Sequence, residues 1–228
     1  MEASFYPSIT PVSVANIPSK EKLLETMVPL IEESESWPLG TKYEEKQWHL
    51  ATQTFWKSRT ARDGAAWHGR VSEHSKESIG GFEPFWNGLG VNHSPNEKEY
   101  VIQIYRRKSC FFTEASHRWS PELDGVKLLK TINDDQEIWA LHYALRPPAS
   151  NRLFTVLFTI HLTTDESTGL RTGYVLSIPV DVASDHSLAS QEYQATRGYY
   201  SAISRVRELP DGGVNWRCVI VYLGVLCK

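Results

Sequence analysis

The apolar positions near the start of the chain recur at helical spacing. Ser19 can cap a helix that runs to about Glu35, because apolar residues return there every three or four positions. Pro29 lies inside this pattern and predicts a kink or an early end of the helix. The string Thr41-Lys42-Tyr43-Glu44 is typical of a capping box and predicts a second helix that ends near Arg59.

From residue 66 onward the spacing of apolar positions changes to that of a strand. Apolar or small residues alternate with polar ones over residues 67–74, which predicts a strand with one polar face. The polar members are His68, Arg70, Ser72 and His74, and the others are Trp67, Gly69 and Val71. Helical spacing then returns over residues 82–89 and predicts a short helix.

The remainder of the chain alternates in short runs that are separated by turn residues. Strands are predicted over residues 99–107, 126–132, 137–145, 154–162, 172–182, 199–209 and 214–226. Turn-rich links such as Asn133-Asp134-Asp135-Gln136 join neighbouring strands into hairpins. Helices that are segregated from an antiparallel meander indicate an α+β fold.

Length and composition fit one globular unit. The chain has 228 residues, of which 41% are hydrophobic and 22% are charged, as in an ordinary folded protein with a sizeable core. Residues 1–18 contain three prolines and are expected to form a loose leader. We expect residues 19–228 to form a single domain.

Charge and motifs exclude several classes of function. The net charge of −3 argues against nucleic-acid binding, which needs a basic surface. The longest apolar run, residues 218–227, is too short for a membrane-spanning helix, so no stable membrane insertion is expected. The first residues lack the features of a signal peptide, which predicts a cytoplasmic protein.

No cofactor or metal ion is expected from the residue pattern. His68 and His74 lie about 20 Å apart along a strand at roughly 3.3 Å per residue, too far to share a metal ion. The three cysteines are widely spaced and form neither a disulfide framework nor a zinc pattern. No glycine-rich nucleotide motif follows a predicted strand.

Several strings, taken in order over roughly residues 45–217, resemble those of one family. They are Trp67-His68-Gly69-Arg70-Val71-Ser72-Glu73-His74, the pair Phe82 and Phe85, His93, Asn96-Glu97, the segment 147–154, Ser177-Ile178-Pro179-Val180-Asp181, Gly198-Tyr199-Tyr200-Ser201 and Asn215-Trp216. Together they resemble an uncharacterised fungal START-like domain family. The resemblance implies a helix-grip fold, in which a curved antiparallel sheet wraps around a long C-terminal helix and leaves a ligand cavity between them.

The sequence departs from this pattern at its end. After Trp216 the segment 217–228 is apolar and β-branched, and it is too short for a strand followed by the long helix. The C-terminal grip helix is therefore expected to be missing or shortened. The helix predicted over residues 41–59, or a partner chain in a homodimer, would then close the cavity.

The polar face of the strand over residues 67–74 carries the candidate chemistry. Arg70 could hold a carboxylate or polarise a carbonyl, and His74 could donate a hydrogen bond or move a proton near neutral pH. These two are the catalytic candidates, although a solvated sheet face explains the same alternation. The ligand-binding candidates are His68, Ser72, Trp139, His142, Tyr143 and Arg152. For Arg152, which matches an arginine of the family strings, an ion pair at the start of a strand is the structural alternative.

Two functions follow from the resemblance. The first is a cofactor-independent cyclase or pericyclase, of Diels-Alderase-like or isomerase type, that folds an apolar polyketide- or terpenoid-like intermediate of fungal secondary metabolism in its cavity. The alternative is a non-catalytic protein that binds or transfers a lipid or another small hydrophobic molecule. Both predict a hydrophobic small molecule as the partner. An inactive scaffold is a third reading, suggested by the missing helix.

Overall fold

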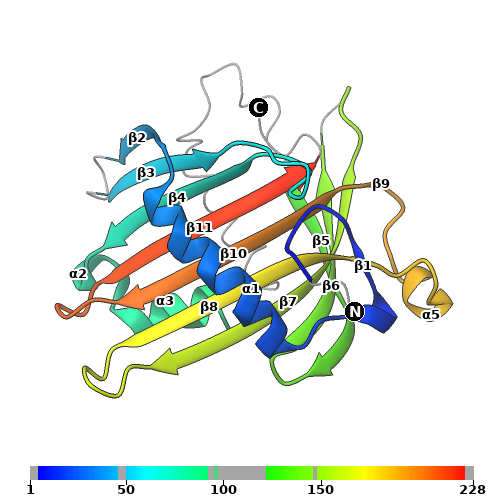
Figure 1. Ribbon diagram of the computed structural model, residues 1–228. Helices are drawn as coiled ribbons and strands as arrows, with labels where there is room; N and C mark the ends of the chain where they lie inside the picture. Colours follow the sequence, from blue (N-terminus) through cyan, green and yellow to red (C-terminus); the bar gives the residue numbers. More distant parts are fainter. Residues whose placement is uncertain (1–4, 46–49, 92–95, 97–121, 146–147, 224–228) are drawn as a thin grey trace.

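The computed structural model describes residues 5–45, 50–91, 96, 122–145 and 148–223. Its strands form one 11-stranded, almost wholly antiparallel sheet, which helix α1 crosses on one side while α2 and α3 lie on the other (Figure 1). The chain thus has the α+β architecture expected from the sequence, a curved antiparallel sheet with few helices.

The elements follow one another as helix, three strands, two helices and a long meander. The helices are α1 (Lys20–Glu33), α2 (Lys76–Ile79), α3 (Phe82–Leu89) and α5 (His186–Ala189), with 3-10 turns η1 (Val14–Asn16) and η2 (Ser34–Ser36). The strands are β1 (Val12–Ser13), β2 (Leu39–Glu45), β3 (Leu50–Lys57), β4 (Trp67–His74), β5 (Glu122–Asn133), β6 (Gln136–Ala144), β7 (Arg152–Thr164), β8 (Arg171–Asp181), β9 (Thr196–Arg197), β10 (Tyr199–Glu208) and β11 (Val214–Leu223). The sheet order is β2-β3-β4-β11-β10-β8-β7-β6-β5, with β1 paired to β8 and β9 to β7.

The sheet carries a separate apolar core on each of its two faces. Along β8, Leu176 and Ile178 join the core beneath α1, whereas Val175 joins the core around Phe82 and Trp86 of α3. We call these sides the α1 face and the α3 face. Because successive side chains of a strand point to opposite faces, a central strand covered on both sides needs a continuous apolar run. This explains why β8 is apolar without alternation.

Helix α1 forms where the sequence predicts it and continues past its proline. Ser19 caps the helix by accepting a hydrogen bond from the backbone N–H of Lys22. The early end predicted at Pro29 does not occur, since the helix runs to Glu33. Pro29 lies on the exposed side, while Met27 and Leu30 on either side of it are buried against the sheet and hold the helix there.

The helix predicted over residues 41–59 is wrong, because this segment forms strands β2 and β3. Phe55 and Trp56 lie on opposite faces, with exposed fractions of 2% and 44%, which is the two-residue period of a strand. The ring of Phe55 sits over Gly69, where an added Cβ would lie 2.0 Å from it. This close packing against β4 overrides the local capping signal. The segment 41–59 therefore cannot close a cavity as a helix.

The segment before Ser19 is not loose in its described part. Val12 and Ser13 pair in parallel with Val180 and Asp181 of β8. The hydroxyl of Tyr6 donates to Asp63 at 2.7 Å, which ties the segment to the link between β3 and β4. Proline-rich sequence predicted freedom here, but these contacts tie the segment to β8 and to the β3–β4 link.

Strand β11 is the last element that the structure describes. β11 runs to Leu223, and within the residues that the structure describes no helix follows it. The strand predicted over residues 99–107, the motif position His93 and residues 224–226 of the last predicted strand lie outside the described residues. The other predicted strands are confirmed to within a few residues.

Candidate functional site

The polar residues of β4 point to the α3 face of the sheet. In the antiparallel register, Ser72 pairs with Trp216 and Arg70 with Cys218 of β11. Trp216 belongs to the core around α3, whereas Trp67 is fully buried in the core beneath α1. His68, Arg70, Ser72 and His74 therefore share one face with part of an apolar core. The alternate residues Trp67 and Val71 belong to the core of the α1 face, and Gly69 lies against the ring of Phe55.

Five side chains on this face form a continuous cluster, which we call the Arg70 cluster. The guanidinium carbon of Arg70 lies 4.4 Å from the ring centre of Trp216, and the Phe85 ring of α3 meets Trp216 edge-on at 6.3 Å. Phe85 also contacts the ring of His74 at 5.0 Å. The Nε2 atom of His74 lies 3.0 Å from Oγ of Ser72. The cluster thus joins one cation, two aromatic rings and a histidine–serine pair.

Burial lowers the pKa of His74 below its ordinary value of 6.5, because water is excluded from the charged ring. The imidazole is consequently neutral at physiological pH and can both donate and accept a hydrogen bond. Ser72 is buried beside the ring, and its hydroxyl forms a hydrogen bond with Nε2 of His74. Arg70 is then the charged member of the cluster at neutral pH.

Two donors of the cluster have no acceptor in the described part of the chain. The indole Nε1 of Trp216 is buried and has no hydrogen-bond partner there. The half-buried Arg70 stacks its guanidinium on Trp216. Among the described residues it has no hydrogen-bond acceptor and no carboxylate partner. Arginine offers five N–H donors in a planar fork, so the cluster presents a strong and unused set of donors.

Away from the cluster, the α3 face carries small side chains bordered by aromatic ones. The row that starts at Arg70 continues through Cys218 and Ser204 to Val175. Cys218, Ser204 and the neighbouring Ala202 are half-buried. Helix α3 covers one end of this face, where Trp86 lies so close to Gly173 that an added Cβ would be 2.2 Å from the ring. No described helix covers the row beyond it.

The sequence-predicted residues on β6 divide between the two faces. Trp139 and Tyr143 belong to the core of the α3 face. His142 points to the α1 face, where its Nδ1 lies 2.5 Å from Asp124 Oδ1 and its ring stacks on Tyr193 at 5.1 Å. Because neighbouring residues of a strand point to opposite faces, Trp139, His142 and Tyr143 cannot all line one binding site on a single face.

Arg152 begins β7 opposite Tyr143, away from the Arg70 cluster. Its Nη1 donates to the backbone oxygen of Ser150 at 3.0 Å. The ion pair that the sequence suggested for it has no carboxylate partner among the described residues. Arg152 thus fixes the start of the strand through the backbone.

Sequence reasoning missed Trp216 and Phe85 as members of the site. Both stood in the family strings, yet neither carries a charge or a reactive group that marks it in a sequence. The alternation along β11 places Trp216 on the polar face of β4 only once the register between these two strands is known.

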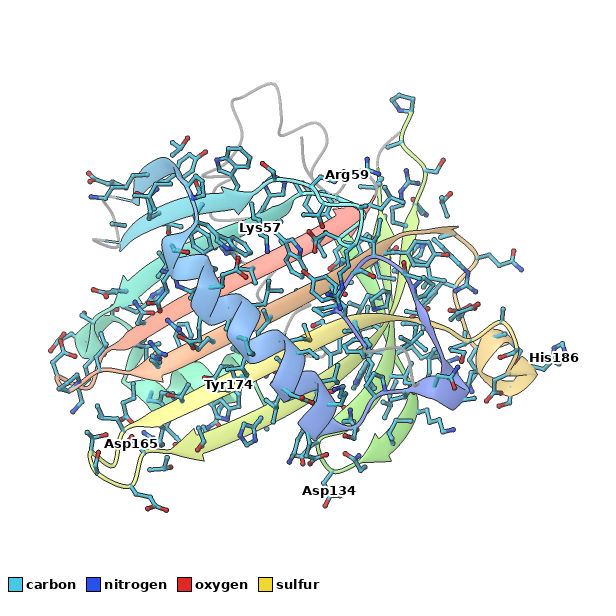
Figure 2. All side chains as sticks on the ribbon, in the orientation of Figure 1. Lys57, Arg59, Asp134, Asp165, Tyr174 and His186 are labelled. Atoms are coloured by element: carbon cyan, nitrogen blue, oxygen red, sulfur yellow. The ribbon has the colours of Figure 1, made fainter. Side chains whose placement is uncertain are left out.

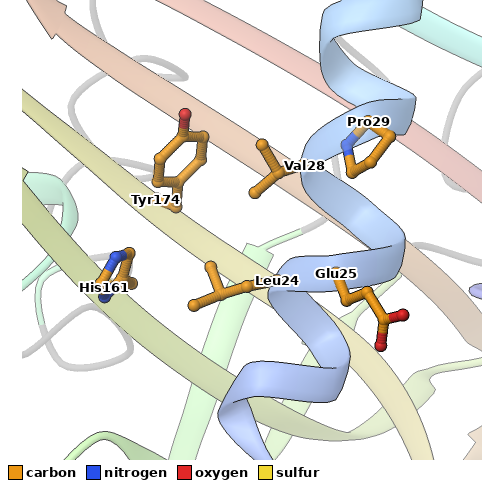
Figure 3. A pocket seen from close by; sticks show the side chains of 6 residues that line it. All are labelled: Leu24, Glu25, Val28, Pro29, His161 and Tyr174. Atoms are coloured by element: carbon orange, nitrogen blue, oxygen red, sulfur yellow. The ribbon is translucent and has the colours of Figure 1, made fainter.

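A hollow lies on the other side of the sheet. It has a volume of about 370 Å³ and is lined by Leu24, Glu25, Val28, Pro29, His161 and Tyr174, between α1 and strands β7 and β8 (Figure 3). Burial raises the pKa of Tyr174, which lies beside α1 (Figure 2). This hollow is open and does not touch Arg70 or His74, so it is not the cavity expected from the sequence.

Neither metal-binding clusters nor spanning helices occur in the described ranges. No three His, Cys, Asp or Glu side chains gather there to hold a metal ion. None of the helices described has both the length and the apolarity needed to cross a membrane.

Comparison with protein families places the chain. The model of a family described as a protein of unknown function (DUF3074) matches residues 67–219, from the first residue of β4 into β11. The chain belongs to this family. The matched segment contains the whole Arg70 cluster. Among curated proteins, no match was found.

Solved structures share the fold of this DUF3074 protein. Human StAR-related lipid transfer protein 5 aligns with a TM-score of 0.51 and 12% identity, over 91% of this chain and 83% of that one. Human STARD10 aligns with a TM-score of 0.50 and 9% identity, over 92% and 71%. At these identities the likeness shows the fold alone, which is START-like. The resemblance to START-like domains seen in the sequence is thus confirmed.

Proposed function

We propose that this protein binds a small hydrophobic molecule against the α3 face of its sheet. The observation that carries the proposal is the row of half-buried small side chains, Cys218, Ser204 and Ala202, beside the apolar core of that face. A ligand that removes about 200 Å² of apolar surface from water would gain roughly 5 kcal/mol at about 25 cal/mol per Å².

The surroundings of this row support an apolar guest. Trp139, Tyr143 and Tyr200 are half-buried members of the same core and offer large, stiff contact surfaces. Binding sites for small molecules are mostly apolar with a few placed polar groups, and the Arg70 cluster supplies such groups at one end. The name of one solved structure of this fold, a human lipid transfer protein, is consistent with such a guest.

A cofactor-independent cyclase is the second candidate, and one observation favours it. Arg70 and the neutral His74 lie on the same face as the proposed guest, where they could polarise a carbonyl and move a proton. Restraint of a flexible chain in a reactive shape can lower a barrier by roughly 7–11 kcal/mol. Incubation with a linear polyketide-type precursor, followed by product analysis, tests it. Unchanged rate and stereochemistry of cyclisation would remove this candidate.

Filling the row tests the binding proposal. Ala202→Phe places a ring in the middle of the α3 face, whereas Ala51→Phe places the same ring at an exposed position of β3. We expect the wild type and Ala51→Phe to bind methyl dodecanoate in isothermal titration calorimetry, and Ala202→Phe to bind it at least tenfold more weakly. Circular dichroism and the melting temperature report whether each variant is folded. Equal binding by both variants would contradict the proposal.

A further inference from the structure

We infer that the guest carries an oxyanion headgroup, a carboxylate or a phosphate, which Arg70 and the indole N–H of Trp216 bind together. The inference rests on the proposed function and adds the chemical class of the ligand. It starts from two adjacent donor groups that lack acceptors in the described structure.

The indole nitrogen is the first of these groups. Trp216 Nε1 is buried, and a buried N–H without an acceptor costs about 1–3 kcal/mol. Such groups are rare in folded proteins, and each one calls for an explanation. An acceptor atom of a bound molecule would satisfy it. An indole can only donate, so the group that it binds must be an acceptor.

The guanidinium of Arg70 is the second group, and it sets the charge of the ligand. The other buried or half-buried arginines described in this sheet have hydrogen-bond acceptors, which are carboxylates for Arg205 (Glu32) and Arg171 (Glu208) and backbone oxygens for Arg217 (Ser34) and Arg152 (Ser150). Arg70 has none among the described residues, and its neighbour His74 is held neutral by burial. A half-buried cation without a counter-charge is costly, and an anionic ligand would remove that cost.

The contact between the two groups orients the donors. The guanidinium carbon lies over the Trp216 ring, 4.4 Å from the ring centre. The flat face of the guanidinium therefore stacks on the ring, and its N–H groups remain available to a ligand. Carboxylate and phosphate oxygens match this edge with two parallel hydrogen bonds, which a neutral ester or alcohol cannot do equally well. The donor set therefore favours an oxyanion over a neutral headgroup.

The rest of the α3 face offers apolar contact surface for the tail of the same molecule. From Arg70 the row runs through Cys218 and Ser204 to Val175 and Ile160, so that polarity falls with distance from the guanidinium. A headgroup at Arg70 would thus place its hydrocarbon chain across β10 and β8. This arrangement matches an amphipathic molecule such as a fatty acid or an alkyl phosphate.

Three probes with one tail separate the headgroup from the tail. Dodecanoate, dodecyl phosphate and methyl dodecanoate are titrated into the wild-type protein, the two anions below their micelle concentrations and the ester below its solubility limit. We expect at least one of the two anions to bind about 10–100-fold more tightly than the ester, the range of a charge-assisted hydrogen bond. The stronger anion identifies the headgroup as a carboxylate or a phosphate. Equal affinities for all three would overturn the inference and leave the proposed function standing.

Variants assign the preference to the two donors. Arg70→Met keeps a long side chain on Trp216 but removes the charge, and it should abolish the preference for the anion while ester binding stays. Trp216→Phe keeps a ring and removes the N–H, and it should weaken anion binding about 5–20-fold. Arg59→Met makes the same exchange at an exposed arginine and should change nothing (Figure 2). An anion preference that survives in Arg70→Met overturns the inference, and a wild type that binds none of the probes overturns the proposed function with it.

Discussion

Arg205 on β10 places its Nη1 atom 2.6 Å from Oε2 of Glu32 on α1. The arginine is only 2% exposed, and its Nη2 also contacts Oε1 of Glu35 at 2.9 Å. These ion pairs connect a central strand of the sheet to the C-terminal end of the helix that covers it. The α1 face is held by this polar contact as well as by its apolar core.

Removal of the buried cation should be costly. We expect Arg205→Ala to lower the free energy of unfolding by about 3 kcal/mol, since it removes a buried side chain with two charge-assisted hydrogen bonds and leaves a cavity. Arg207→Ala removes a half-exposed arginine that contacts the same Glu32 at 2.9 Å, and it should cost below about 1 kcal/mol. Urea unfolding followed by circular dichroism measures both values. Similar losses in the two variants would show that the burial of Arg205 is not what matters.

The same contact predicts a loss of stability in acid. The hydrogen bond from Arg205 lowers the pKa of Glu35 below its ordinary value of 4.5. A carboxyl whose folded pKa is depressed contributes stability above its unfolded pKa, and this contribution is lost as the pH falls through the folded pKa. Stability should therefore fall below about pH 4.5, and Glu35→Gln should make the slope shallower there. An unchanged slope in this variant would assign the acid sensitivity to other carboxyl groups.

His74 should titrate below free histidine. Burial lowers its pKa from 6.5, so the unfolded chain binds a proton that the folded chain does not, and stability should decrease as the pH falls below that value. An NMR titration of the ring signals, assigned by their loss in His74→Gln, measures the midpoint. A midpoint at or above 6.5 would contradict the burial of the ring by Phe85. Binding of an anion at Arg70 should raise this midpoint, because a negative charge nearby favours the protonated ring.

The contact between α3 and β8 predicts a pair of mutations that compensate. Gly173→Ala would place its Cβ 2.2 Å from the Trp86 ring, and we expect a loss of about 1–3 kcal/mol from overpacking. Trp86→Leu removes the obstructing ring and is itself destabilising by loss of packing. In the double variant, the loss of unfolding free energy should be smaller than the sum of the two single losses by about 1 kcal/mol or more. Additive losses from thermal or urea unfolding would show that the glycine is not required for the approach of α3.

Local pattern was sufficient to predict most of the elements. The alternation over β4 and the helical stripe of α1 appear in the sequence because each period is a property of the backbone itself. The α+β class and the order of the hairpins followed from these periods. The helix over residues 41–59 was wrong, because this segment forms strands that pair with each other and with β4. The described part of the leader is not loose, because β1 pairs with β8, which lies far away in the sequence.

The candidate site divides in the same way. That His68, Arg70, Ser72 and His74 share a face is determined by the two-residue period and could be predicted from the sequence. The partners of Arg70 could not, because the β4–β11 register and the approach of α3 bring Trp216 and Phe85 to it. The sequence by itself therefore determined which side chains project together from one strand. Only the tertiary structure decided what faces them, since contacts between distant segments depend on pairing and packing that no local pattern encodes.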